Sequence, residues 1–243
     1  RYTTDHKVVG IQYLVVTMAI FGIAGVMAMM IRTNLANPGG GLLNPQAYNS
    51  LVGTHGIMMI VGAIIMVTGP FGNYIMPIMI GARDMAFPRL NALSLWLIVA
   101  AAVPLIWGQF IGGISTGWVA YNPLAGQAPL GMNGYIMFIC IFALSTMVAG
   151  SNITTTVIKM RAKGMTWNRT PIFIHGVVAS VALALPAFPT FFLSQVMSGM
   201  DRALGTSFYV PKDGGSGWLY EHLFWLMGHP EVYVILIPAV AAL

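Results

Sequence analysis

Long uncharged apolar runs recur along the chain and are separated by short polar loops. The six runs lie at about 8–31, 51–80, 91–115, 132–158, 171–199 and 217–243. Each reaches the roughly 20 residues that an α-helix needs to cross the hydrocarbon core of a bilayer. A membrane β-barrel would instead show alternating segments of about ten residues. The pattern therefore predicts an all-α integral membrane protein with six transmembrane helices.

Composition supports this prediction and excludes a soluble protein with a large core. Apolar residues make up 57% of the 243 residues and charged residues only 7%, whereas soluble domains carry about 25% charged residues. The single cysteine, Cys140, lies inside an apolar run and permits no internal disulfide. The last run reaches Leu243 without a closing polar flank, so we expect the chain to be part of a longer or split protein. Membrane lipid is an expected partner, and nucleic acid is not.

Lysine and arginine are distributed unequally between the two sets of loops. One set holds Arg1, Lys7, Arg83, Arg89, Lys159, Arg161, Lys163 and Arg169, and the other holds Arg32, Arg202 and Lys212. Because positively charged loops stay on the cytoplasmic side, the N-terminus is predicted to face the cytoplasm, or the matrix in an organelle. The sixth run then starts at the outer side, and its polar residues lie near mid-membrane.

The sixth run carries a histidine, a glutamate and a tyrosine within five residues. His229 and Tyr233 are four residues apart and share one helix face, while Glu231 points about 200° away from His229. Pro230, between them, removes a backbone donor. An apolar environment disfavours the charged carboxylate, so we expect Glu231 to rest protonated. Ionisable residues within membrane spans are functional candidates, although a hydrogen-bonded cluster that only joins helices is an open alternative.

Two further histidines lie near helix ends. His55 is followed by Gly56, which allows a flat group to approach the helix closely, and haem iron is often held by histidine. A hydrogen-bonded interfacial histidine is the alternative for His55. His175 is interpreted as structural.

Asp84 follows the second run directly, next to Arg83. The neighbouring runs are rich in amides and hydroxyls that can hold a chain of waters: Asn73, Asn91, Ser94, Ser145, Thr146, Ser151 and Asn152. A path from Asp84 to Glu231 would then carry protons. The alternatives are a salt-bridged surface acid and small polar residues that join helices.

Several stretches resemble subunit I of the haem–copper terminal oxidases. They are "TDHKVVGIQYL", "THGIMMI", "GNYIMPIMIGARDMAFPRLNALS", "GWVAYNPL" and "FWLMGHPEVYVILIP". The similarity covers essentially the whole chain in order. It implies the first half of a twelve-helix bundle, and with it low-spin haem, high-spin haem and copper as cofactors.

The resemblance implies roles for residues at the metal centres. His55 resembles an axial ligand of the low-spin haem, Arg32 the arginine that contacts a substituent of that haem, and Trp118 the tryptophan near the haem propionates. His229 resembles a ligand of the copper, and Tyr233 the tyrosine that is joined to that histidine. The histidines of the family's second half are not in this chain, so no metal site is expected to be complete within it.

The resemblance also implies a proton path. Glu231 resembles the carboxylate at which protons branch, and Asp84 resembles the mouth of the channel that leads to it. The implied lining consists of Asn73, Asn91, Ser94, Ser145, Asn152 and Tyr13. Phe142 stands where the family has a serine, so the upper path is expected to differ in detail.

The activity implied by the resemblance is reduction of O2 to water, with proton pumping. Tyr233 favours oxygen over nitric oxide, because related nitric oxide reductases lack this tyrosine. Ile23 and Met27 stand where the quinol-oxidising branch has an arginine and an aspartate, which favours cytochrome c, or its electron-donating subunit, as donor. The alternatives are a quinol-oxidising member and a proton channel or transporter without redox cofactors. Expected partners are other oxidase subunits and the remaining half of subunit I, in a bacterial inner membrane or, alternatively, the mitochondrial one.

Overall fold

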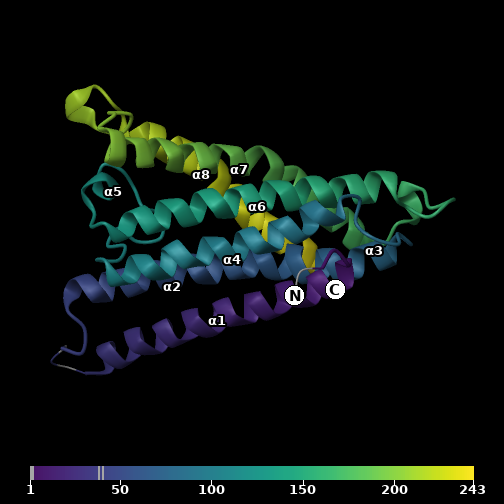
Figure 1. Cartoon of the computed structure of the whole chain (residues 1–243), viewed down its shortest axis with the longest axis horizontal. Coiled ribbons are helices and arrows are strands. Elements are labelled where there is room, and N and C mark those ends of the chain that lie inside the picture. Colours follow the sequence, from purple (N-terminus) through teal and green to yellow (C-terminus); the bar gives the residue numbers. More distant parts are fainter. Residues whose placement is uncertain (1–2, 38, 40) are drawn as a thin grey trace.

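The computed structural model describes every residue except 1, 2, 38 and 40, and six long helical segments dominate it (Figure 1). They are α1 (His6–Ala36), α2 (Pro45–Met66) with its continuations η1 (Val67–Ile75) and α3 (Met76–Met79), α4 (Pro88–Phe110), α6 (Gly131–Lys159), α7 (Ile172–Leu204) and α8 (Gly217–Ala241). The connecting loops contain α5 (Leu124–Gln127), η2 (Trp167–Arg169) and η3 (Pro211–Asp213). The described residues include no β-strand, so the predicted all-α fold is confirmed.

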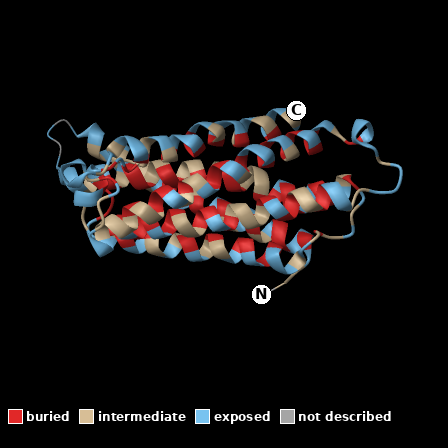
Figure 2. Cartoon of the chain, turned by 90° about the horizontal axis from the view of Figure 1, so that it is seen from above, coloured by how far each residue is buried: buried red, intermediate tan, exposed pale blue. Residues whose placement is uncertain are grey.

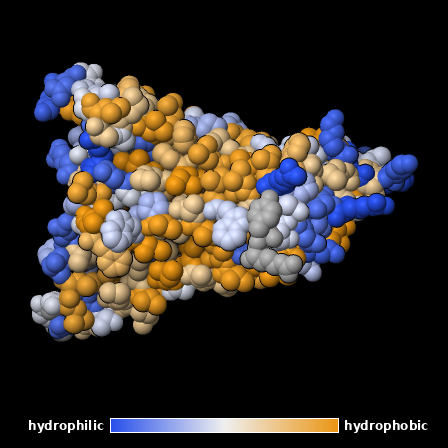
Figure 3. All heavy atoms as spheres, viewed as in Figure 1, coloured by the Kyte–Doolittle hydropathy of each residue, from blue (hydrophilic) through white to orange (hydrophobic). Residues whose placement is uncertain are grey.

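Each long segment is apolar and long enough to cross a bilayer. Even α4, with 23 residues, spans about 34 Å at 1.5 Å per residue, against a hydrocarbon core of about 30 Å. Apolar side chains cover the middle of the surface and polar ones gather toward its two ends (Figure 3). The protein is an integral membrane protein. Its N-terminal end carries the loops 80–87 and 160–171, and its distal end carries the loop 111–130 and the loop 205–216.

Four helix ends differ by five or six residues from the boundaries that the hydrophobic pattern predicts. Helix α2 begins at Pro45 rather than at 51, and α7 ends at Leu204 rather than at 199. The third span was expected to continue to 115, but α4 ends at Phe110. Gly112 and Gly113 follow with φ of 107° and 64°, conformations that glycine adopts without steric cost and that end a helix. The first span continues past 31 to Ala36, which brings Arg32 into α1.

Helix α6 lies at the centre of the bundle and α1 at its edge (Figure 1). Buried residues concentrate on the inward-facing sides of the helices (Figure 2). Helix α6 packs against α4 and α7, α7 packs against α8, and α1 packs against α2, η1 and α4. Half of the residues in the most apolar stretch of α6 are buried, against 17% in that of α1. Much of α1 therefore faces outward from the bundle.

Small residues bring α4 and α6 close together near the distal end. A Cβ atom on Gly134 would fall on the carbonyl oxygen of Pro104, and one on Gly131 would fall on that of Gly108. Close backbone approach at glycines is typical of helix pairs in membranes, where packing drives association.

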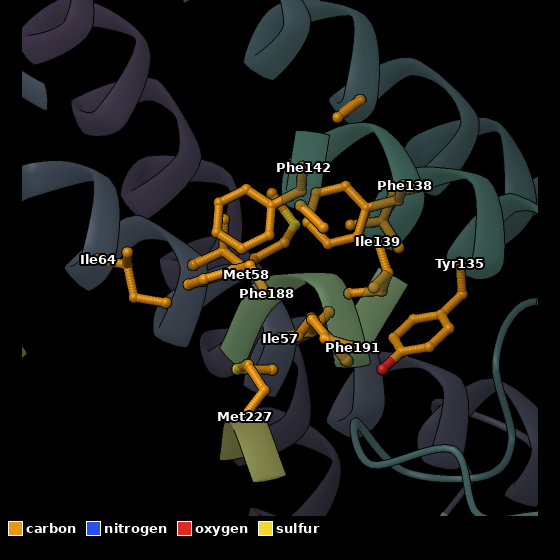
Figure 4. Close-up of a cluster of buried hydrophobic side chains, with 14 of the residues drawn as sticks. Ile57, Met58, Ile64, Tyr135, Phe138, Ile139, Phe142, Phe188, Phe191 and Met227 are labelled. Atoms are coloured by element: carbon orange, nitrogen blue, oxygen red, sulfur yellow. The ribbon is translucent and has the colours of Figure 1, made fainter. Parts of the chain in front are cut away.

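Aromatic and aliphatic side chains from α2, α6, α7 and α8 form the main core (Figure 4). The rings of Phe142 and Phe188 meet edge to face, with centroids 5.7 Å apart, and those of Phe191 and Phe224 do so at 5.3 Å. Such pairs contribute about 0.5–1.5 kcal/mol beyond their buried area. Phe142 therefore has a packing role in this core.

Candidate functional site

Helix α8 separates its chemistry onto two faces. The rings of His229 and Tyr233 lie edge to face on the exposed side, with centroids 4.9 Å apart. Glu231 faces the bundle, with only 4% of its surface exposed. Pro230 lies within the helix, which stays continuous from Gly217 to Ala241. The face that carries His229 and Tyr233 is called the metal-ligand face below.

Helix α8 reaches a small internal cavity through Val234, three residues after the buried Glu231. None of the described residues hydrogen-bonds the Glu231 carboxylate. One turn further along α8, the Ser180 hydroxyl of α7 donates to the carbonyl of Val234 at 2.7 Å. That carbonyl lacks its usual helical partner because Pro238 has no N–H. Ser180 and Val234 both line a cavity of about 30 Å³, room for roughly two water molecules.

The same cavity reaches a group of buried polar side chains from α1, η1, α4 and α6, which we call the polar column. Its members are Tyr13, Asn73, Asn91, Ser94 and Ser145, all no more than 3% exposed. The Tyr13 hydroxyl donates to Ser94 Oγ at 2.8 Å, Ser94 Oγ donates to the Asn91 carbonyl at 2.8 Å, and Ser145 Oγ donates to the Ser94 carbonyl at 2.7 Å. The structure therefore brings together residues that lie 132 positions apart in the sequence, from Tyr13 to Ser145.

Two atoms of the polar column have no protein partner. Asn73 donates through Nδ2 to the Gly69 carbonyl at 2.8 Å, but its Oδ1 acceptor is buried and unpartnered, as is the Nδ2 donor of Asn91. Buried polar atoms are normally satisfied by protein or by ordered water. A donor and an acceptor left over in one column are suited to binding water.

Asn73 lies in η1, a π-helical segment of nine residues inside the second span. Pro70 lies within it and cannot donate the usual helical hydrogen bond. Segments of π-helix often occur at functional sites. Here the segment also presents the Asn73 carbonyl to Nδ1 of His6 at 2.7 Å.

His6 is a buried histidine that the sequence analysis did not select. It is 4% exposed and lies at the start of α1, seven residues before Tyr13. A signal was present, because His6, Val9, Tyr13 and Thr17 repeat at helical spacing and all four are buried. His6 therefore lies at the end of the polar column nearest the N-terminus.

Asn152, expected to line the path, makes two hydrogen bonds to the loop that carries Asp84. Its Oδ1 accepts from the Phe87 amide at 2.9 Å and its Nδ2 donates to the Phe87 carbonyl at 3.2 Å. Asp84 is half-buried and accepts from the Met85 amide at 2.7 Å. It pairs with no cation among the described residues, so a salt bridge to Arg83 has no support.

His55 is oriented by a backbone carbonyl. Its Nδ1 lies 3.0 Å from the carbonyl oxygen of Ala24 in α1. This contact favours the tautomer with a proton on Nδ1 and leaves Nε2 as the available ligand atom, an arrangement typical of metal-bound histidine. His175, in contrast, is hydrogen-bonded locally through Nε2 to Thr170 Oγ1 at 2.9 Å and to the Trp167 carbonyl at 3.1 Å.

Trp118 lies at the distal end between α2, which carries His55, and α8, which carries His229. Its side chain lies against Gly56, where a Cβ would be 3.5 Å away. Its ring meets those of Phe224 and Trp225 of α8, with centroids 5.7 and 6.2 Å apart. The Tyr135 hydroxyl donates to the Trp118 carbonyl. Arg32 is exposed on α1, and the structure does not bring it to these groups.

The described residues contain no group of three or more histidine, cysteine, aspartate or glutamate side chains that could enclose a metal ion. His55 and His229 could each offer one ligand atom, and a metal centre at either would need further ligands from other residues. These single ligands fit axial ligation of haem iron and partial ligation of copper.

The fold and the site define a class: polytopic α-helical membrane proteins that combine candidate metal ligands with a buried carboxylate and a polar column. Residues 8–243 match the family described as "Cytochrome C and Quinol oxidase polypeptide I". The chain belongs to this family.

Relatives from three organisms show how much of a subunit the chain represents. It is 40% identical over 239 residues to cytochrome c oxidase subunit 1 of Thermostichus vulcanus, covering 98% of this chain and 43% of the relative. The same protein of Bacillus subtilis is also 40% identical over 239 residues, with 98% and 38% covered. The heme-copper oxidase subunit I+III of Aeropyrum pernix is 39% identical over 246 residues, with 99% and 30% covered. The chain thus spans less than half the length of these relatives.

Proposed function

We propose that this chain forms the first six spans of the catalytic subunit of a proton-pumping cytochrome c oxidase, which reduces O2 to water. The observation that carries the proposal is the arrangement on α8. One face presents His229 and Tyr233, and the other buries Glu231 three residues before Val234, which lines the same cavity as Tyr13, Asn73 and Ser145 of the polar column.

In this proposal the chain positions the metal centres and delivers protons. Haem iron and copper, when bound, supply electrons to oxygen. His55 offers Nε2 to the low-spin haem, because its Nδ1 faces the Ala24 carbonyl. His229 would hold copper, and Tyr233 beside it would supply a proton and an electron to the reaction. Trp118 and Arg32 would contact the haem in the complete subunit.

Protons enter at Asp84 and reach Glu231 through the polar column. The unpartnered Asn73 Oδ1 and Asn91 Nδ2 hold water, and Tyr13, Ser94 and Ser145 continue the chain of hydrogen bonds. Asn152 keeps the Asp84 loop in place. Glu231 holds a proton in an apolar environment and passes it on, toward oxygen or across the membrane.

The electron donor is cytochrome c or a subunit that relays its electrons, because Ile23 and Met27 lack the polar groups of the quinol-oxidising branch. The partners are the remaining part of subunit I and other oxidase subunits. The N-terminal end faces the cytoplasm of a bacterium, since it carries eight of the eleven lysines and arginines.

An optical spectrum of the purified complex tests the redox function against a proton channel without cofactors. We expect haem bands in the reduced-minus-oxidised spectrum and oxygen consumption with reduced cytochrome c. His55→Ala should remove the low-spin haem signal, whereas His175→Ala, a matched histidine with local hydrogen bonds, should leave it intact. A complex without haem bands would refute the proposal.

A further inference from the structure

The loop between α6 and α7 concentrates positive charge at the N-terminal end of the bundle. Four cations, Lys159, Arg161, Lys163 and Arg169, lie within eleven residues, and no acidic residue occurs between Asp84 and Asp201. The bundle itself does not neutralise this charge, because none of the four pairs with a carboxylate among the described residues.

Arg161 gives the loop a fixed shape. Its guanidinium lies over the Trp167 ring, 4.1 Å from the ring centroid. Nη1 donates to the Val157 carbonyl at 2.7 Å, and Nε donates to the Met165 carbonyl at 3.2 Å. These contacts close the loop on the end of α6. The other three cations are exposed.

A second loop lies against the first and adds cations. The Ala162 amide donates to the Ile80 carbonyl at 2.9 Å, and a Cβ on Gly81 would lie 3.0 Å from that of Ala162. The loop after Ile80 carries the exposed Arg83, and Arg89 lies exposed in the first turn of α4. We call the exposed cations Lys159, Lys163, Arg169, Arg83 and Arg89 the basic shelf.

The basic shelf lies at the level where the apolar spans end. Trp167 is 39% exposed and Ile172, the first residue of α7, is 74% exposed. Tryptophan is enriched at the boundary between hydrocarbon and headgroups. Cations with an exposed tryptophan and an exposed isoleucine match a ligand that has a negative head and an apolar tail.

The distal end differs in each of these features. Arg202 donates to the carbonyls of Ala125, Gly126, Ala128 and Pro129 and to Asn133 Oδ1, so its donors face protein. The remaining cations there, Arg32 and Lys212, share that end with Asp201, Asp213 and Glu221. The excess of positive charge is therefore confined to the N-terminal end.

We propose that the basic shelf binds the phosphate headgroup of an anionic phospholipid in the leaflet at the N-terminal end. Lysine and arginine side chains donate hydrogen bonds to the phosphate oxygens, Trp167 packs beside the glycerol region, and Ile172 contacts the acyl chain. Clusters of cations next to membrane spans are attracted to anionic lipids. An acidic soluble protein is a poorer match, because the apolar side chains of the site lie at the edge of the membrane-spanning surface.

The test uses the complete oxidase complex in nanodiscs of phosphatidylcholine that contain phosphatidylglycerol. Native mass spectrometry after mild detergent extraction counts the phosphatidylglycerol molecules that stay bound. The double variant Lys163→Gln, Arg169→Gln should retain fewer of them by about twofold or more, with unchanged retention of phosphatidylcholine. Added salt should weaken retention in the wild type more than in the variant. Arg161 is left intact because it shapes the loop.

Lys212→Gln is the matched control, since Lys212 is an exposed lysine at the opposite end. It should retain as much phosphatidylglycerol as the wild type. The proposal is overturned if the double variant retains phosphatidylglycerol at the wild-type level, the result expected if another subunit covers the loop. It is also overturned if Lys212→Gln loses as much lipid as the double variant. Neither outcome depends on haem content or turnover.

Discussion

The polar column and the metal-ligand face are opposite kinds of site within one bundle. The column is closed: its members come from four helical segments and are almost fully buried, and hydrogen bonds join Tyr13, Asn91, Ser94 and Ser145. The metal-ligand face is open. His229 and Tyr233 are exposed, together with Trp225 and Leu236 along the same side of α8.

This difference shows which part of the proposed function the chain contains by itself. The proposed proton path from Asp84 to Glu231 would use only residues of this chain. The metal centres need more, because His55 and His229 offer one ligand each and the relatives are more than twice as long. Substitutions on the open face should therefore affect metal content, and substitutions in the closed column should affect proton delivery with metals in place.

The largest effect is expected on the open face. His229→Ala should remove the copper and reduce oxygen turnover by about 100-fold or more, roughly 2.7 kcal/mol on the limiting barrier. The low-spin haem spectrum should persist, because His55 lies on a different helix. Metal analysis, oxygen consumption and a reduced-minus-oxidised spectrum measure the three outcomes.

His222→Ala is the control for this variant, since His222 lies exposed on the same helix and its Nδ1 contacts the Trp218 carbonyl at 2.7 Å. Copper content should stay at the wild-type level in His222→Ala. Full copper occupancy in His229→Ala would show that His229 is not a ligand.

The next largest effect is expected at Glu231, which lies on α8 opposite the metal-ligand face. Glu231→Gln keeps the size and hydrogen-bonding capacity of the side chain but cannot release a proton. Haem and copper content should be normal, and steady-state turnover should fall by about tenfold, or 1.4 kcal/mol. Glu221→Gln, ten residues earlier on the same helix and half-buried, should turn over normally. Wild-type turnover with intact pumping in Glu231→Gln would leave Glu231 with a packing role only.

Sequence periodicity was sufficient to predict the all-α fold and the division of α8 into two faces. Apolar run lengths predicted six spans, and the spacing of His229, Glu231 and Tyr233 predicted which side chains share a face. These features are local, so a 3.6-residue period determines them. Helix ends were less accurate, because the stop at Phe110 depends on the conformation of Gly112 and Gly113.

Contacts between distant segments were not predictable from spacing. Asn152 is 65 residues from Phe87, the backbone of which it holds, and His6 is 67 residues from Asn73. The hydrogen bond from the Tyr135 hydroxyl to the Trp118 carbonyl likewise depends on how α6 packs against the loop 111–130. Only the three-dimensional packing shows which polar side chains bond to one another within the column and which bond to the backbone of a neighbouring segment.

A smaller effect is expected at the mouth of the column. Asp84→Asn should slow proton uptake from the N-terminal side and reduce turnover by about threefold, or 0.7 kcal/mol, because water still reaches the column. A pH-sensitive dye on either side of reconstituted vesicles measures the uptake. Arg83→Gln should have no effect, since Arg83 is exposed and unpaired with Asp84. Unchanged proton uptake in Asp84→Asn would show that protons enter at another residue.

The smallest effect on turnover is expected at Asn152, which hydrogen-bonds the backbone of the loop that carries Asp84. Asn152→Ala removes both hydrogen bonds to Phe87 and should change turnover less than about twofold. It should, however, reduce the stability of the Asp84 loop by about 1 kcal/mol. The Phe87 amide loses its acceptor, so its hydrogen exchange should accelerate, while the Ala86 amide stays bonded to Thr156 Oγ1 at 2.9 Å. Ser151→Ala, an exposed neighbour on α6, should leave both amides unchanged. If Asn152→Ala instead blocked proton uptake as strongly as Asp84→Asn while Phe87 stayed protected, Asn152 would line the path as the sequence predicted, and the closed column would extend from Asp84 without a break.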